Sequence, residues 1–388
     1  MIKSIIAILG SIFLWVNICL AGEINYYNKS WSAIKEKAKK EHKYIFIDAY
    51  TSWCGWCKVM DKETMKDNKV IDFLNNNFVS VKMDMEHGEG NLLSMKYHIM
   101  GYPTFMFFNP DGIYVYKSMG YQNAEDFLKE LTNALDKSKQ FVASGFSNDI
   151  NIDFPEFYKK AYAENGKREV PKPEVISSYL DGQKDLFSEI NWGILSRFDL
   201  KDKYTGFFLD HLDNYANLYG RDNVEGKLKF VLNTKLQEAI KEKSDTKLSD
   251  LLNLTDKYVK DDPEGKKIYY RITYLGETKQ WSKQAEAIED FVTKSNNKNV
   301  SFLNGLCWNL YEQCDNSAVL KQACTWMANV IKSNQDYAYL DTYAALLYKS
   351  GNKKDAEIWA NKAIDIGTKA GEKVDSTRLL LEKIRQEK

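Results

Sequence analysis

The run WCGWCK at residues 53–58 decides how this chain is interpreted. Two cysteines separated by two residues can exchange with other disulfides, because one thiolate attacks and the other thiol resolves the mixed disulfide. Helical periodicity resumes after Cys54, which predicts that Cys54 lies at the N-terminus of a helix. The free N–H groups and the dipole at that end stabilise an anion. We therefore expect Cys54 to be the nucleophile and Cys57, one turn further and more buried, to be the resolving cysteine.

A CxxC pair alone does not establish redox chemistry, since zinc sites and permanent disulfides contain it too. Zinc fits poorly, because one CxxC supplies two ligands and the histidines show no paired spacing. The 4 histidines are His42, His87, His98 and His211. A permanent disulfide without turnover is the alternative, so the choice depends on the residues around the pair.

An acidic residue stands in the apolar run that precedes the motif. The run from Tyr44 to Tyr50 is rich in strand-forming residues, and Asp48 lies inside it, six residues before Cys54. A carboxylate in an apolar strand is costly unless it has a partner or a function. Asp48 is therefore either part of the thiol chemistry or a buried carboxylate with satisfied hydrogen bonds and no catalytic use.

The elements around the motif predict one α/β domain with a mixed sheet flanked by helices. Helices are expected over residues 30–42, directly after Cys54, and over residues 70–75, 92–97 and 124–135. Strands are expected over residues 44–50, 78–83, 104–108 and 113–117, with an acidic loop at 84–90 and a turn at 109–112.

Three features together resemble the thioredoxin superfamily, whose members carry an aspartate, a WCxxCK motif and a cis-proline in this order. They are Asp48, the WCGWCK run and the run GYPT at residues 101–104. The resemblance covers about residues 30–136, within a domain placed at 23–136. The segment at 62–77 is similar to the thioredoxin-like domains of exported bacterial proteins.

The resemblance implies a role for each residue of the site. Pro103 would be cis and pack beside the sulfurs, and the backbone of Tyr102 would be free to pair with an extended substrate segment. Asp48 would lie beneath Cys57 and take its proton as the mixed disulfide resolves. Lys82 matches the lysine that commonly neighbours this aspartate, the alternative being a lysine that is simply solvated. The expected substrate-binding residues are Trp53, Gly55, Trp56, Tyr102 and Pro103.

The dipeptide between the cysteines bears on the direction of electron flow. Gly55-Trp56 departs from the Gly-Pro of reducing thioredoxins and from the Pro-His and Gly-His of strong oxidants and isomerases. Neither residue adds a cation that would stabilise the thiolate further. We therefore expect a reductant or a disulfide-shuffling protein, although the potential also depends on the helix dipole, burial and hydrogen bonds. No cofactor is expected beyond the redox-active Cys54–Cys57 disulfide.

The first 22 residues predict an export signal. Lys3 supplies a positive start, residues 5–16 form an apolar run, and the CLA run at 19–21 places small residues where a signal peptidase cleaves, near Ala21. The run is short for a membrane span, and an uncleaved anchor is the alternative. Lipid attachment at Cys19 is disfavoured by the bulky Ile18. We expect a periplasmic or secreted protein without stable membrane insertion.

The remainder of the chain predicts helices. Residues 137–153 are polar and are expected to be a linker, and residues 154–388 show helical periods with short breaks. Residues of about 300–366 resemble tetratricopeptide-like hairpins, because small and apolar positions recur about 33 residues apart. These positions are Ala323, Met327 and Val330, then Ala356, Ala360 and Ala363. The fold class expected is thus a thioredoxin-like α/β domain followed by an all-α domain.

Three further cysteines lie in the helical region. If residues 315–316 turn between two antiparallel helices, Cys307 and Cys324 lie at the same height on facing helices, and a disulfide between them is geometrically feasible. The alternative is that these two and Cys314 are buried free thiols that pack as small hydrophobic groups. Neither interpretation suggests a catalytic role.

Charge composition and cysteine usage limit the function. Lysine plus arginine and aspartate plus glutamate both number 54, so no net field draws nucleic acid or an anionic membrane. We expect an exported thiol–disulfide oxidoreductase whose partners are protein thiols or disulfides and an electron-donor protein. The alternative is a scaffold in which the helical region binds a peptide or protein and the thioredoxin-like domain is a recognition module.

Overall fold

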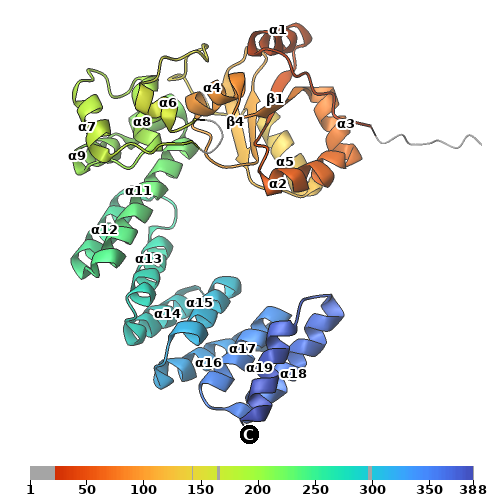
Figure 1. Cartoon of the computed structure of the whole chain (residues 1–388), viewed down its shortest axis with the longest axis vertical. Coiled ribbons are helices and arrows are strands. Elements are labelled where there is room, and N and C mark those ends of the chain that lie inside the picture. The colour runs from red at the N-terminus through yellow and green to blue at the C-terminus, as the bar shows by residue number, and fades with distance from the viewer. Residues whose placement is uncertain (1–21, 142, 164–166, 296–298, 388) are drawn as a thin grey trace, which may run out of the picture. The chain divides into compact units, whose positions relative to one another are not determined.

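The computed structural model of the chain describes residues 22–141, 143–163, 167–295 and 299–387, and it divides into two compact units at Leu228 and Lys229 (Figure 1). The predicted export signal lies outside these residues apart from Gly22. None of the described helices is long and apolar enough to cross a membrane.

A four-stranded mixed sheet forms the centre of the first unit. The strands are β1 (Tyr44–Tyr50), β2 (Phe78–Asp84), β3 (Thr104–Phe108) and β4 (Tyr114–Met119), in the order β2-β1-β3-β4. The pair β1/β2 is parallel, whereas β1/β3 and β3/β4 are antiparallel. The two inner strands are buried along nearly their whole length, which explains why their sequences are mostly apolar, with Asp48 as the charged exception.

Helices cover both faces of this sheet. They are α1 (Trp31–Glu41), α2 (Gly55–Lys62), α3 (Asn68–Asn77), α4 (Gly88–Tyr97) and α5 (Ala124–Leu135), with a 3-10 turn at Thr64–Lys66. Alternate residues of β1 enter different cores: Ile45 and Ile47 pack with α1 and α4, while Phe46 packs with α2, α3 and α5. Asp48 lies two residues after Phe46 in the strand, so its side chain is on the same face of the sheet, the face that α2 covers. The expected α/β fold is confirmed.

The acidic segment after β2 differs from the prediction of a loop over 84–90, because α4 begins at Gly88. A Cβ at Gly90 would lie 2.0 Å from the carbonyl oxygen of Asp84. The helix therefore starts directly against the end of β2, and only glycine permits this close approach.

The expected linker at 137–153 lies within the first unit, whose boundary falls at residue 228. Phe141, Phe146 and Ile150 pack against the core shared by α1 and α4. The ring of Phe146 meets that of Tyr97 at 4.9 Å. A few apolar residues in a mostly polar stretch thus fix this segment on the sheet domain.

Five short helices complete the first unit: α6 (Glu156–Lys160), α7 (Pro173–Asp181), α8 (Glu189–Arg197), α9 (Asp202–Asp210) and α10 (Leu212–Tyr219). Helix α8 lies next to α4 (Figure 1). A buried ion pair joins them, since Lys96 of α4 bonds to the Glu189 carboxylate with side chains 1% and 12% exposed. Burial lowers the pKa of Lys96, and Glu189 opposes that shift. The other Glu189 oxygen accepts from the backbone N–H of Ser147 at 3.0 Å.

The second unit is helical throughout the residues described. After α11 (Arg221–Glu242), which spans the boundary, it contains α12 (Asp245–Tyr258), α13 (Pro263–Glu277), α14 (Trp281–Ser295), α15 (Val300–Gln313), α16 (Ser317–Ser333), α17 (Tyr337–Lys349), α18 (Lys353–Ala370) and α19 (Asp375–Gln386). Ala344 and Ala345 of α17 share a core with Ala356 and Ala360 of α18. These small side chains let the two helices pack closely, as the sequence predicts.

Replacing Lys96 by Met tests the buried ion pair. It leaves the Glu189 carboxylate buried without its cation, so we expect the free energy of unfolding to fall by about 3 kcal/mol. Urea denaturation measures this loss. Adding Glu189→Gln removes the unpaired charge and keeps an acceptor for Ser147, so the double variant should regain most of the stability. Equal instability of the single and double variants would contradict the interpretation.

Candidate active site

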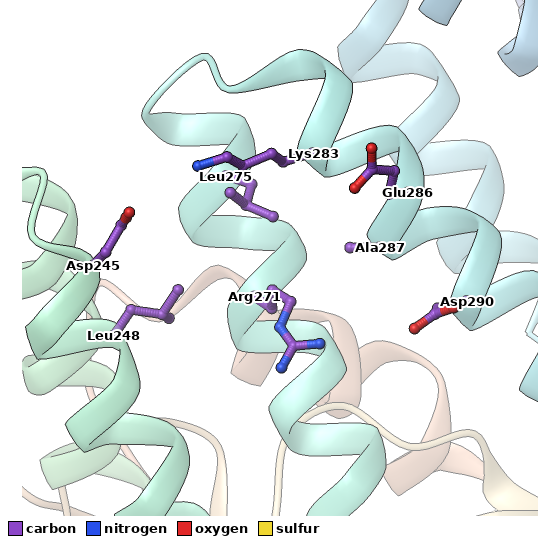
Figure 2. Close-up of a pocket in the computed structure, with 8 residues that line it drawn as sticks. All are labelled: Asp245, Leu248, Arg271, Leu275, Lys283, Glu286, Ala287 and Asp290. Atoms are coloured by element: carbon purple, nitrogen blue, oxygen red, sulfur yellow. The ribbon is translucent and has the colours of Figure 1, made fainter.

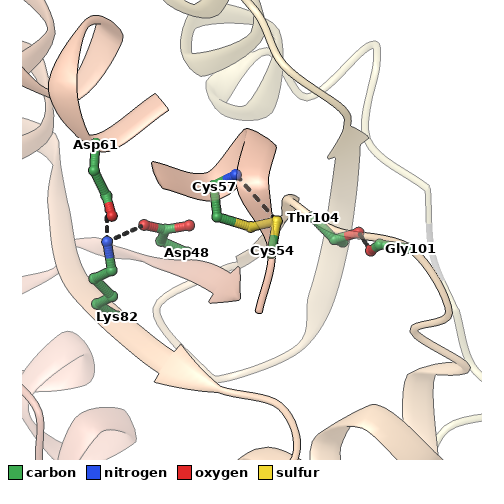
Figure 3. Close-up of a disulfide and its surroundings, with 7 residues drawn as sticks. All are labelled: Asp48, Cys54, Cys57, Asp61, Lys82, Gly101 and Thr104. Atoms are coloured by element: carbon green, nitrogen blue, oxygen red, sulfur yellow. Dashed lines mark hydrogen bonds and ion pairs between the residues drawn. A yellow bond between two sulfur atoms is a disulfide. The ribbon is translucent and has the colours of Figure 1, made fainter. Parts of the chain in front are cut away.

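Cys54 and Cys57 form a disulfide at the start of α2 (Figure 3). Cys54 is the N-cap of the helix, and its sulfur accepts a hydrogen bond from the backbone N–H of Cys57 at 3.0 Å. This places Cys54 at the helix N-terminus, as expected. The expected difference in burial is absent, since both residues are 4% exposed. In the oxidised form each sulfur covers the other, which accounts for the equal burial.

The residues around the disulfide expose large apolar side chains. Trp53 is 60% and Trp56 61% exposed, and Gly55 between the cysteines is exposed as well. The Trp56 ring contacts that of Tyr121 with centroids 5.5 Å apart. Exposed tryptophans are uncommon unless a partner covers them. This surface is therefore suited to docking another protein.

Asp48 is buried in β1 with 3% exposure, on the face covered by α2. In the parallel register it pairs with Lys82 of β2. The Lys82 ammonium lies 3.5 Å from an Asp48 oxygen and also bonds to Asp61 of α2. Figure 3 shows the Asp48 carboxylate between Lys82 and the cysteine pair. With its side chain 22% exposed, Lys82 is not simply solvated.

Burial and the neighbouring charges set the pKa values of Asp48 and Lys82. It raises the pKa of Asp48 to about 6; Lys82 opposes the shift and Asp61 adds to it. Burial alone would lower the pKa of Lys82, but Asp48 and Asp61 together raise it. Asp48 can thus gain and lose a proton near neutral pH while Lys82 stays charged. A buried carboxyl poised in this range can serve as a general base.

Asp61 and Tyr26 belong to this cluster although no motif marked them. Asp61 follows Cys57 by four residues on α2, so the two share a helix face. That spacing was a signal available in the sequence. Tyr26 precedes the first helix; burial, followed by Asp48 and Asp61, raises the pKa of its phenol. Nothing in the sequence connects Tyr26 with these carboxylates.

The GYPT run forms the other side of the site. The Tyr102–Pro103 peptide bond is cis, as the resemblance implies. The Thr104 hydroxyl donates to the Gly101 carbonyl at 2.7 Å (Figure 3), and the Gly120 N–H donates to the Pro103 carbonyl at 2.9 Å. The backbone groups of Tyr102 make no hydrogen bond to another residue within the described chain.

The three cysteines of the second unit are free thiols. The structure has no Cys307–Cys324 bond and is thus closer to the second of the two sequence interpretations, although Cys324 is only partly buried. Burial raises the pKa of Cys307, and the nearby Cys324 adds to the shift. Burial likewise raises the pKa of Cys324. Neither thiol is disposed to form a thiolate. Over the described residues, no group of three or more His, Cys, Asp or Glu side chains could hold a metal ion.

A cleft of about 460 Å³ lies in the second unit between α12, α13 and α14 (Figure 2). Its apolar residues are Leu248, Leu275 and Ala287. Charged residues of both signs surround them: Asp245, Arg271, Lys283, Glu286 and Asp290.

Comparisons with known proteins found similar sequences for the N-terminal third of the chain. A family model described as "Thioredox_DsbH: Protein of unknown function, DUF255" matches residues 16–144. "Thiol:disulfide interchange protein DsbD" of Yersinia pestis (strain Pestoides F) is 31% identical over 99 residues, 25% of this chain and 17% of that protein. The protein of the same name in Campylobacter jejuni (strain RM1221) is 29% identical over 107 residues, 27% of this chain and 18% of that protein.

A solved structure, "Solution Structure of a putative disulphide-isomerase from Bacteroides thetaiotaomicron", is 38% identical. The match covers 30% of this chain and 97% of the chain in that structure, with a TM-score of 0.29. The chain spans less than a fifth of the length of the two DsbD relatives.

The sheet order, the CxxC pair at a helix N-cap and the cis-proline define a thioredoxin-like domain. Within that class, residues 16–144 are similar to the Thioredox_DsbH family and to part of the DsbD proteins.

Replacing Asp48 by Asn tests the burial of its charge. Because the folded pKa of about 6 exceeds the ordinary aspartate pKa of 3.8, the stability of the wild-type protein falls as pH rises between these two values and then levels off. Below both values Asp48 is protonated in either state and contributes nothing. We therefore expect Asp48→Asn to be more stable by about 3 kcal/mol at pH 8.

Denaturation of the oxidised protein at a series of pH values measures this difference, which should vanish below about pH 4. Asp111→Asn, at a carboxylate whose side chain is 64% exposed, is the matched control and should leave the curve unchanged. An advantage of Asp48→Asn that persisted at low pH would show that the buried charge is not its cause.

Proposed function

We propose that the protein is an exported thiol–disulfide oxidoreductase that acts on protein partners through Cys54 and Cys57. The observation that carries this proposal is the pair at the N-cap of α2, with the buried Asp48 carboxylate behind it and exposed tryptophans around it. A disulfide with only a structural role needs neither a buried carboxylate near neutral pKa nor an exposed apolar surface.

In the reducing direction, the Cys54 thiolate attacks one sulfur of a partner disulfide, forms a mixed disulfide and releases the other partner sulfur as a thiolate. Cys57 then gives its proton to Asp48 and attacks the Cys54 sulfur. This forms the Cys54–Cys57 disulfide and expels the second partner thiolate, which takes a proton from water. The partner gains two electrons and the cysteine pair loses two. An electron-donor protein with a dithiol restores the reduced pair.

The helix N-terminus favours the Cys54 thiolate, because its N–H groups and dipole stabilise negative charge. The two residues between the cysteines, Gly55 and Trp56, add no cation. We therefore assign a reducing or isomerising role. The reduction potential of the Cys54–Cys57 pair is the measurement that separates these roles from that of a strong oxidant.

Trp53, Gly55, Trp56, Tyr102 and Pro103 would bind the partner. The exposed indoles offer apolar surface, and the Tyr102 backbone has hydrogen-bonding capacity for an extended segment. Strand addition of this kind depends on backbone atoms, so it suits partners of varied sequence.

The helical second unit is proposed to hold a partner or a peptide. The cleft between α12 and α14 supports this assignment, as does the tetratricopeptide-like spacing of the later helices (Figure 2). The DsbD relatives are thiol:disulfide interchange proteins by name. With the predicted signal at residues 1–22, this suggests work in the periplasm or outside the cell.

Substitution of the nucleophile tests the proposed activity. In a dithiol-coupled insulin reduction assay, Cys54→Ser should fall to the uncatalysed rate, because no thiolate remains to attack. Cys324→Ser, in the second unit, is the control and should retain wild-type activity. Cys57→Ala should accumulate mixed disulfides with partner proteins through Cys54. Purely non-covalent partners, with no turnover by the wild-type protein, would favour the scaffold alternative.

The pH dependence of resolution tests Asp48. In the wild-type protein, the rate at which Cys57 resolves a preformed mixed disulfide should rise through about pH 6 as Asp48 loses its proton. In Asp48→Asn this step should disappear, and the rate at neutral pH should fall roughly 10- to 100-fold. Rapid mixing of the trapped mixed disulfide over a pH series provides the measurement. Identical profiles for the two proteins would rule out Asp48 as the base.

A further inference from the structure

We propose that Arg168, which lies after the thioredoxin-like domain in the sequence, is a positioning residue of the redox site. It acts through Glu86 to hold the Trp53 indole beside Cys54, and thereby sets the affinity for protein disulfides. The proposal rests on the thiol–disulfide exchange proposed above and names a determinant of partner binding that lies outside residues 16–144.

One carboxylate connects Arg168 with Trp53. An Arg168 guanidinium nitrogen lies 2.6 Å from one oxygen of Glu86. The Trp53 indole N–H donates to the other oxygen of Glu86 at 3.0 Å. Each oxygen thus has its own partner, and the three side chains form a continuous hydrogen-bonded chain that ends next to the nucleophile.

The same cluster reaches the cis-proline side of the site. The rings of Trp53 and Tyr102 meet edge to face, with centroids 5.9 Å apart. Burial raises the pKa of Tyr102, and the Arg168 guanidinium opposes that shift through charge and hydrogen bonding. Arg168 therefore lies near Trp53, the residue before Cys54, and near Tyr102, the residue before Pro103.

Glu86 needs Arg168 in order to hold Trp53. The Glu86 side chain is only 8% exposed, and a buried carboxylate without a cation is costly. If Arg168 is removed, Glu86 is stabilised by turning toward water, and this movement weakens its bond to the indole. Trp53, which is 60% exposed, would then be free to adopt other rotamers.

The segment that carries Arg168 is anchored to the first unit. The backbone N–H of Glu169 donates to the Lys160 carbonyl at 3.1 Å, and the two side chains form an ion pair at 3.4 Å. Nearby, the Asn91 side chain of α4 donates to the Tyr162 carbonyl at 2.8 Å. These contacts hold the backbone around Arg168 against the thioredoxin-like domain. The Arg168 side chain therefore extends from a fixed backbone position.

Loss of a preformed docking surface weakens partner binding without changing the thiol chemistry. Binding that is equal in the ground and transition states affects KM and leaves kcat unchanged. For Arg168→Gln we therefore expect the KM for insulin to rise about 3- to 10-fold, the net range of one ordinary hydrogen bond, with kcat within about 2-fold of wild type. A small aromatic disulfide, which does not need the surface, should react at the wild-type rate.

The experiment compares Arg168→Gln, Arg168→Lys and Lys167→Gln in the full chain. Arg168→Lys keeps the charge and should restore part of the affinity, and Lys167→Gln, at the exposed neighbouring residue, should match the wild type. Near-ultraviolet circular dichroism gives a readout that does not depend on activity. The signal that Trp53→Phe removes identifies the Trp53 band, and Arg168→Gln should remove the same band.

Several outcomes would overturn the proposal. They are an unchanged KM and Trp53 band in Arg168→Gln, equal losses with insulin and with the small disulfide, or additive effects of Arg168→Gln and Trp53→Phe on KM. If the wild-type protein showed no exchange at all, the proposed function would fail. The Trp53 band would still decide whether Arg168 positions the indole.

Discussion

The pairing of Asp48 with Lys82 across two parallel strands is the interaction on which the candidate site depends. A carboxylate in the central strand of a sheet covered on both faces would be expelled or protonated without a nearby cation. Lys82 supplies that cation and is itself held by Asp61 of α2. The helix that begins at the cysteine pair is thus tied to the strand that carries Asp48. The two sulfurs and the proposed proton acceptor are fixed by the same set of charges.

The helices that follow the sheet are part of the same compact unit, and charged contacts show how they are attached. Lys96 and Glu189 join α4 to α8 where water is excluded, while Arg168 reaches Glu86 at the edge of the redox surface. The first contact secures the position of the added helices. The second brings a group from the added segment close to Trp53. In the proposed exchange, specificity for protein partners could therefore change through the added segment without altering the cysteine pair.

Much of the fold could be predicted from local patterns. The strand at 44–50 and the helix after Cys54 follow from apolar runs and periodicity, and the structure contains both. Errors arose where packing overrides composition. The stretch 137–153 is polar on average, yet Phe146 and Ile150 fix it to the sheet domain. The acidic segment after β2 enters a helix early because Gly90 permits contact with the strand end.

The sequence by itself determined the thiol pair, its place at a helix N-terminus, the strand carboxylate Asp48 and the cis-proline, because each depends on residues close together in the chain or on a motif order shared with thioredoxins. Only the tertiary structure decided which groups meet them. Asp61, Glu86 and Arg168 acquire their roles through contacts between segments far apart in sequence. Such contacts depend on how helices and strands pack. The four-residue spacing relates Asp61 to Cys57, but no local spacing shows that Asp61 meets Lys82 or that Arg168 meets Glu86.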